Sequence, residues 1–446
     1  MKRLLTPALH LNRRNVLKGV AATAALAAVS KAAYVPAANA ATLDNHVTLT
    51  RSRLDDLAQV SYESFNEHDV LAPFDRDRFS ARHDVDLYRL STYTQVPETG
   101  ETVKATGLLA VPAKVSGPIP VVSWQHGTIF SFVQVPSTLT LAANPNYVLE
   151  ENVDSKETLF NVHRFAANGY AVIAADYLGK GPLRQSRSEA YAVKEASVQT
   201  CIDILNAGLA AMKQLDLEPS ELFLNGWSQG GLNTQWLRQA LQRAGTPVVA
   251  AGAASPFNDL SDAFAYWTGG ISFRNPTAEP YPKRPAWLVL ATAILIGSYE
   301  AYYGLDGLMA ATVRPEYQAP LQKFWKDYAL DFDLAQLPMP EQMLIDGYFE
   351  RFTSPINSQF LRQLAANRAT YFDYGSPMRL FYGLADEAIH PSMAQQPLPA
   401  GGRFIDGVAI KRASHRGTFL ASLYGGPSDL QGKPNLLEWF NGLRSP

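Results

Sequence analysis

The residue best placed to do chemistry is a serine flanked by glycines, in Gly226-Trp227-Ser228-Gln229-Gly230. A strand-like apolar segment precedes this serine, and a helical pattern follows it. A sharp strand-to-helix turn would project the serine oxygen above a sheet, and the glycines would let the chain turn tightly. The N-terminus of the following helix favours a nearby negative charge. We therefore predict that Ser228 is a nucleophile.

A serine at its ordinary pKa needs a nearby base, which an acid orients. At a strand–serine–helix site, the order along the chain is serine, acid, histidine. Two histidines follow Ser228 in the sequence, His390 and His415. His415 comes just after the last candidate strand, whereas His390 lies too close in the chain to the candidate acid to face it easily. The sequence favours His415 as the base and leaves His390 as a surface or supporting histidine.

The acid is expected at the end of the strand that precedes the base. Asp386 and Glu387 both follow the candidate strand that ends at Gly383. Ligand chemistry in open α/β sheets gathers at the carboxyl ends of strands. We predict Asp386 as the acid, with Glu387 as the main rival and Asp373 as a distant third. The choice between the two neighbours depends on geometry and stays open in the sequence.

Two backbone N–H groups are expected to stabilise an oxyanion. Gln229, the residue after the nucleophile, would supply the first. The second would come from the loop after the first parallel strand, where either Gly127 or Thr128 is the candidate donor. Losing one such donor typically costs about 3 kcal/mol of transition-state stabilisation. The adjacent His126 is expected to order this loop through hydrogen bonds, without acting as a base.

The alternation of strand-like and helical segments along the chain indicates which elements position these residues. From Ile119 onward, apolar strands alternate with helical stretches, and further strands are expected near Tyr170, Glu221 and Val248. Such alternation predicts βαβ units and a mainly parallel sheet flanked by helices, that is, an α/β fold. An antiparallel hairpin is expected before it, over about 84–111.

The alternation of strands and helices stops over residues 257–372, which are rich in aromatic residues and proline. We predict a helical cap there, inserted between two parts of one core, residues 41–256 and 373–446. Residues 43–80 are assigned to an N-terminal arm of the first part. A separately folded second domain is the competing interpretation. Aromatic residues of the insertion, such as Phe264 and Trp325, would either line an acyl pocket or form the core of the insertion itself.

Residues 1–40 resemble a twin-arginine export signal of bacterial type. The consecutive Arg13 and Arg14 precede a short alanine-rich apolar stretch. The segment ends in Ala38-Asn39-Ala40, the small-x-small pattern that a signal peptidase accepts. The alternatives are a basic amphipathic leader and an uncleaved anchor, but the apolar stretch is too short to cross ~30 Å of hydrocarbon. A periplasmic or secreted location is therefore predicted.

The amino-acid composition indicates which kinds of binding partner are not expected. The chain has 39 Lys and Arg and 41 Asp and Glu residues. Residues 1–40 contain no Asp or Glu, so their removal makes the net charge more negative. A mildly acidic protein is not expected to bind nucleic acid. The apolar run over 287–297 is too short for a membrane span, so no stable membrane insertion is expected after signal cleavage. The histidines are scattered and Cys201 is the single cysteine, so neither a metal nor another cofactor is expected.

Taken together, these motifs resemble the α/β-hydrolase superfamily over most of residues 84–446. His126-Gly127-Thr128, the segment 175–181 and the glycine-flanked serine are similar to the secretory lipase family. The resemblance implies an α/β-hydrolase fold with a helical cap inserted before the strand that carries the acid. It also implies cleavage of carboxylic esters, either small molecules or lipids, through an acyl-serine intermediate.

Two other interpretations stay open in the sequence. The same three residues would serve an acyltransferase or an amide or peptide hydrolase. The remaining alternative is an exported binding protein that kept the fold without catalysis. Acyl chain length, alcohol preference and oligomeric state have no signature in the sequence.

Overall fold

The computed structural model describes most of the chain after residue 40. The described ranges are 41–66, 70–151, 153–185, 187–329, 337–350 and 354–444. The predicted export signal, residues 1–40, lies outside them.

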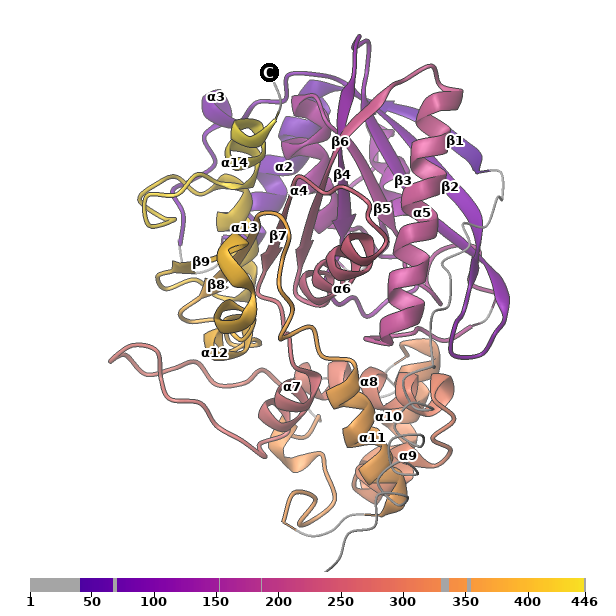
Figure 1. The fold of residues 1–446 in the computed structure, drawn as a ribbon, viewed down its shortest axis with the longest axis vertical. Coiled ribbons are helices and arrows are strands. Elements are labelled where there is room, and N and C mark those ends of the chain that lie inside the picture. The colour runs from indigo at the N-terminus through magenta and orange to yellow at the C-terminus, as the bar shows by residue number, and fades with distance from the viewer. Residues whose placement is uncertain are drawn as a thin grey trace, which may run out of the picture. The chain divides into compact units, whose positions relative to one another are not determined.

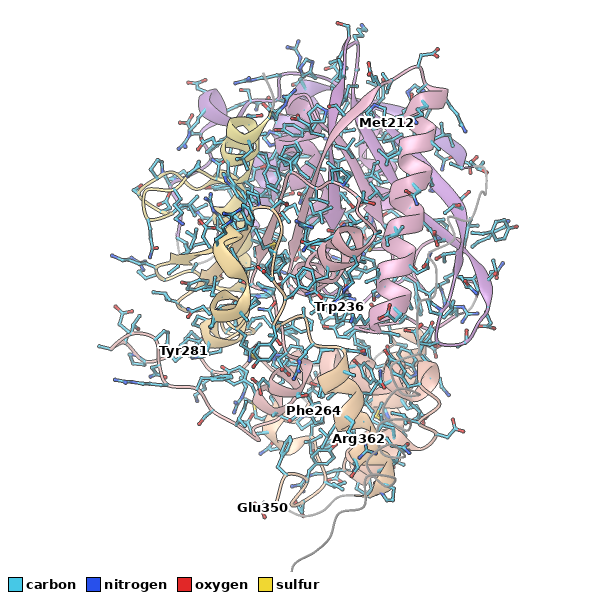
Figure 2. All side chains as sticks on the ribbon, in the orientation of Figure 1. Met212, Trp236, Phe264, Tyr281, Glu350 and Arg362 are labelled. Atoms are coloured by element: carbon cyan, nitrogen blue, oxygen red, sulfur yellow. The ribbon has the colours of Figure 1, made fainter. Side chains whose placement is uncertain are left out.

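Within these ranges, nine strands form one mixed sheet in the order β1-β2-β3-β5-β4-β6-β7-β8-β9 (Figure 1). Their bounds are β1 Thr42–Leu49, β2 Val85–Gln95, β3 Thr102–Pro112, β4 Ile119–Gln125, β5 Ala171–Ala175, β6 Pro219–Trp227, β7 Ala250–Ala254, β8 Met378–Gly383 and β9 Ile405–Ile410. The first four strands in this order pair antiparallel, and all pairs from β5 to β9 are parallel. The predicted α/β class with a mostly parallel sheet is confirmed.

Helices cover both faces of the sheet, which explains why its central strands are apolar on both sides. Side chains of β4 alternate between the faces: Val121 packs into one hydrophobic core, and Val122 and Trp124 pack into the other. The first core includes residues of α5 and α6, which lie in front of the sheet in Figure 1. The second includes residues of α2, α4, α13 and α14. The bounds are α2 Arg51–Phe65, α4 Lys156–Arg164, α5 Lys194–Gln214, α6 Gln229–Arg243, α13 His415–Tyr424 and α14 Leu436–Leu443.

The segment assigned to an N-terminal arm contains regular structure. β1 pairs with β2 as an edge strand of the sheet, and α2 packs against α4. β1 is mostly exposed and carries the polar residues Asp44, Asn45 and His46. It therefore lacks the alternating apolar pattern by which a half-buried strand is recognised.

Between β7 and β8 the chain forms five α-helices within the described residues. They are α7 Leu260–Trp267, α8 Leu288–Tyr302, α9 Leu308–Thr312, α10 Pro315–Asp327 and α11 Pro355–Ala366. Figure 1 shows them grouped at one end of the sheet. α8 is apolar on all sides and buried, as such a helix must be. Phe264 and Trp325 are buried in the hydrophobic core, together with residues of α8.

Short helices complete the described secondary structure. They are α3 Arg76–Phe79, α12 Pro391–Ala394 and the 3-10 helices η2 Pro136–Ala143, η3 Ala166–Asn168, η5 Pro340–Gln342, η6 Leu398–Ala400 and η7 Gly402–Phe404. In the part of the chain that the structure describes, no helix combines the length and apolar character needed to cross a membrane.

Candidate active site

Ser228 lies at the sharp turn between β6 and α6. Its backbone has φ 56° and ψ −120°, a conformation that non-glycine residues rarely adopt and that the surrounding structure must enforce. The glycines on both sides are required by space. A Cβ atom on Gly226 would lie 2.2 Å from the carbonyl oxygen of Gly230, and one on Gly230 would lie 1.9 Å from that of Gln125. The tight packing of these backbones thus fixes Ser228 at the N-terminus of α6.

His415 and Asp386 meet at the carboxyl ends of the last two strands. Nδ1 of His415, the first residue of α13, lies 3.0 Å from both carboxylate oxygens of Asp386. Three further donors fix this carboxylate. The backbone N–H groups of Ala388 and Ile389 donate to Oδ1 at 3.1 and 2.8 Å, and the Ser255 hydroxyl donates to Oδ2 at 2.6 Å. The aspartate is therefore held in one orientation toward the imidazole.

The two rival acids have different positions. Glu387 accepts a hydrogen bond from the backbone N–H of His415 at 3.0 Å and supports the main chain of that residue. The backbone carbonyl of Asp373 accepts from Gln242, near the C-terminal end of α6. Because Ser228 precedes the opposite end of this 15-residue helix, Asp373 is about 20 Å from the serine. This geometry favours Asp386 as the partner of the imidazole.

The charges around His415 favour its protonated form. Burial by itself opposes protonation, but the charge of Asp386, the hydrogen bond to it and the charges of Glu387 and Glu157 outweigh burial. The pKa of His415 is therefore raised above its ordinary value. Burial, reinforced by the charge of Asp386, raises the pKa of the Glu387 carboxyl. An imidazole in this setting is well suited to accept a proton from a nearby hydroxyl.

The loop after β4 carries the second predicted oxyanion donor. The N–H of Gly127 is already engaged, because it donates to Oε2 of Glu157 at 2.6 Å. The N–H of Thr128 has no acceptor among the described residues, and the Thr128 hydroxyl pairs with that of Tyr191 at 2.8 Å. Gln229 is the first residue of α6, so its N–H has no acceptor within that helix. These contacts leave Thr128 and Gln229, and not Gly127, with available donors.

His126 orders this loop from inside the protein. Its Nδ1 donates to the carbonyl of Gly127 at 2.8 Å, and its ring stacks on Tyr177 with the centroids 4.0 Å apart. The hydroxyl of Tyr177 in turn donates to the carbonyl of His126 at 2.9 Å. Burial lowers the pKa of His126 to about 4, so the imidazole is neutral at physiological pH. A neutral ring in this position supports the backbone around Thr128.

Ser228 and His415 both line a cavity of about 530 Å³. Its aromatic lining residues are Phe65, Phe130, Trp227 and Trp287, and its charged lining residues are Glu151, Lys156, Glu157, Glu387 and Arg416. Glu151 pairs with Lys156 and, at 2.8 Å, with Arg416. No recognisable sequence motif marks Glu157, Glu151 or Phe130 as residues of a site. The cavity combines aromatic walls with several charged groups.

His390 is buried, which excludes the surface position considered for it. Its Nδ1 accepts a hydrogen bond from the N–H of Ser392 at 3.2 Å. Its ring stacks on Phe273 and packs against Tyr281, whose hydroxyl donates to the backbone carbonyl of Asp386. Burial lowers the pKa of His390 to about 4. His390 thus belongs to the packing that supports the loop of Asp386.

Over the described ranges, no group of three or more His, Cys, Asp or Glu side chains is arranged to hold a metal ion.

The fold is similar to the folds of several solved structures. No protein-family model and no curated protein matches the chain. A putative hydrolase from Legionella pneumophila superposes with a TM-score of 0.68 at 19% identity, over 90% of this chain and 98% of its own. The rice cell wall degrading esterase LipA from Xanthomonas oryzae superposes with a TM-score of 0.66 at 18% identity, over 85% of this chain and 92% of its own. Candida antarctica lipase A in its closed state superposes with a TM-score of 0.55 at 15% identity, over 74% of this chain and 73% of its own. At these identities the likeness is one of fold, and the fold of this chain is that of the α/β-hydrolases.

Proposed function

We propose that this protein is a serine hydrolase that cleaves carboxylic esters through an acyl-serine intermediate. One observation carries the proposal: Ser228, in its strained turn, and His415, which is hydrogen-bonded to the buried Asp386, line the same cavity. A nucleophile, a base and an orienting acid are the groups that acyl transfer needs. The neighbours named esterase and lipase support an ester as the substrate.

In the proposed mechanism, the oxygen of Ser228 attacks the ester carbonyl while Nε2 of His415 takes its proton. Asp386 holds Nδ1 of the imidazole and thereby fixes the tautomer that leaves Nε2 free to accept. The N–H groups of Gln229 and Thr128 stabilise the oxyanion. His415 then returns the proton to the leaving alcohol. Water, activated by the same imidazole, releases the acid from the serine.

We further propose that the helices between β7 and β8 act as a cap over this site. The supporting contact is Trp287, which directly precedes α8 and lines the cavity. Its ring centroid lies 6.5 Å from that of His415 and 6.2 Å from that of Phe130, which is on the loop after β4. A cap in this position would exclude water from the reacting ester.

The proposed function is tested by hydrolysis of p-nitrophenyl esters from acetate to palmitate. We expect Ser228→Ala to lose at least about 10⁴-fold in kcat, because the nucleophile itself is removed. Ser64→Ala, on the exposed face of α2, is the matched control and keeps wild-type activity. Product analysis with an added alcohol distinguishes hydrolysis from acyl transfer. A folded wild-type protein that cleaves no ester of the series would contradict the proposal.

A further inference from the structure

Glu157 is a buried carboxyl group inside the candidate active site that the triad does not use. It lies in the first turn of α4, is 8% exposed and lines the same cavity as Ser228 and His415. Its Oε2 accepts the N–H of Gly127 at 2.6 Å, which is shorter than the usual N–H···O distance. Burying a carboxylate is costly unless it is well bonded. A helix cap alone would not require this position, because Glu157 points its carboxylate at another loop.

The peptide groups on both sides of Gly127 are fixed. Its N–H is bound by Glu157, and its carbonyl accepts from Nδ1 of His126 at 2.8 Å. The glycine has no side chain to restrict its rotation, so these two hydrogen bonds determine how the peptide lies. The next N–H along the chain belongs to Thr128, the proposed oxyanion donor. Glu157 therefore acts one peptide away from the donor.

The electrostatic surroundings of Glu157 link it to the base. The other charged or titratable groups that line the cavity are Glu151 and Lys156 near the start of α4, Glu387 after β8, and His415 and Arg416 on α13. Burial raises the pKa of Glu157 to about 7, although the Gly127 hydrogen bond and the charges of His415 and Arg416 act in the opposite direction. In return, the negative charge of Glu157 helps to raise the pKa of His415.

We propose that Glu157 is a positioning residue of the hydrolase, which orients the Gly127 peptide so that the Thr128 N–H faces the oxyanion and which tunes the basicity of His415. The proposal rests on the proposed function. Preorganised donors stabilise a transition state because they need not reorient as charge develops. Without Glu157, the N–H of Gly127 would lose its acceptor, and the His126 hydrogen bond to the Gly127 carbonyl would be left alone to hold the peptide that carries the Thr128 N–H.

Two substitutions separate the two parts of this role. Glu157→Leu removes both the acceptor and the charge, and we expect kcat on p-nitrophenyl butyrate to fall about 10- to 100-fold with KM within twofold. Glu157→Gln keeps an acceptor oxygen, so kcat at pH 8 stays within about threefold of wild type. Because the negative charge of Glu157 is lost, the acid limb of the kcat/KM profile moves toward lower pH. Glu63→Leu and Glu63→Gln, on an exposed position of α2, are the matched controls.

Each outcome decides between this inference and its alternatives. A folded Glu157→Leu with wild-type kcat overturns it, as does a fall confined to KM. Should Glu157→Leu fail to fold, Glu157→Gln decides: a pH profile that coincides with wild type overturns the inference, and the predicted shift supports it. Labelling of Ser228 by a fluorophosphonate tests the proposed function separately. A wild-type protein that neither cleaves esters nor reacts with this probe overturns the proposed function itself, and the role of Glu157 with it.

Discussion

Two adjacent carboxylates, Asp386 and Glu387, have distinct surroundings at the candidate site. Asp386 binds the imidazole of His415 through both oxygens, whereas Glu387 binds only the backbone N–H of that residue. A side-chain contact fixes the tautomer of the imidazole, and a backbone contact fixes only the start of α13. The orienting role therefore belongs to Asp386 in the proposed mechanism.

This difference predicts unequal effects of two similar substitutions. We expect Asp386→Asn to lower kcat by about 10⁴-fold, since an amide stabilises the wrong tautomer and leaves the imidazolium without its counter-charge. Glu387→Gln keeps an acceptor for the N–H of His415, and its loss is expected to stay below about tenfold. Steady-state kinetics on one ester at pH 8 measure both. Equal losses in the two variants would contradict the assignment of the acid.

The types and spacing of Ser228, Asp386 and His415 made them candidates from the sequence, because a nucleophile turn and the strand ends that follow it have recognisable signatures. The choice of Asp386 over Glu387 needed the structure, since neighbours in the chain share every pattern. Glu157 had no signature at all. An acidic residue in the first turn of a helix is usually explained by the helix dipole, and nothing in the sequence connects it with Gly127.

At the scale of elements, a network around a buried ion pair connects the helices between β7 and β8 to the loop after β4. Nζ of Lys180 lies 3.1 Å from Oε2 of Glu189, and both side chains are buried. Lys180 also donates to the backbone carbonyl of Ile129, next to Thr128, at 3.0 Å. Tyr328, at the end of α10, bonds to both Lys180 and Glu189 through its hydroxyl. The position of α10 is thus coupled to the loop that carries the proposed oxyanion donor.

This coupling predicts the cost of removing one hydroxyl. Tyr328→Phe keeps the ring but leaves a buried carboxylate short of a donor, so we expect the free energy of unfolding to fall by about 1–3 kcal/mol. Urea unfolding measures this change. Tyr371→Phe, at an exposed tyrosine, is the control and stays within about 0.5 kcal/mol of wild type. If both variants were equally stable, the buried network would not hold α10 in place.

The element pattern was easier to predict where strands are buried than where they lie at an edge. Strands such as β4 and β5 are recognisable in the sequence as apolar runs, because helices cover both faces of the sheet there. The edge strand β1 is mostly exposed and polar, so no alternating apolar pattern in the sequence marks its pairing with β2. The order of the strands in the sheet likewise follows from long-range pairing and not from any local pattern.

At the scale of the whole molecule, the sequence predicts a cleavage site after Ala40. β1, the first described strand, begins at Thr42, and Ala41 before it is buried. A cut after Ala40 would therefore leave every described strand and helix intact. We propose, from the arginine pair and the small-x-small pattern of residues 38–40, that residues 1–40 direct export and that the mature protein functions outside the cytoplasm.

We predict that the arginine pair directs this export. In a bacterial host, the full-length chain should appear in the periplasm with Ala41 as its first residue, as mass spectrometry of the purified protein can show. Replacing both Arg13 and Arg14 by lysine keeps the charge but removes the motif, and we expect periplasmic ester hydrolysis to fall at least tenfold while activity accumulates in the cytoplasm. Arg3→Lys, in the same segment but outside the pair, is the control and leaves export unchanged. Because the cytoplasmic fraction is assayed too, a folding defect is distinguished from a transport defect: the former lowers activity in both fractions. Unchanged export of the double variant would show that the pair is not the signal and that another route carries the protein.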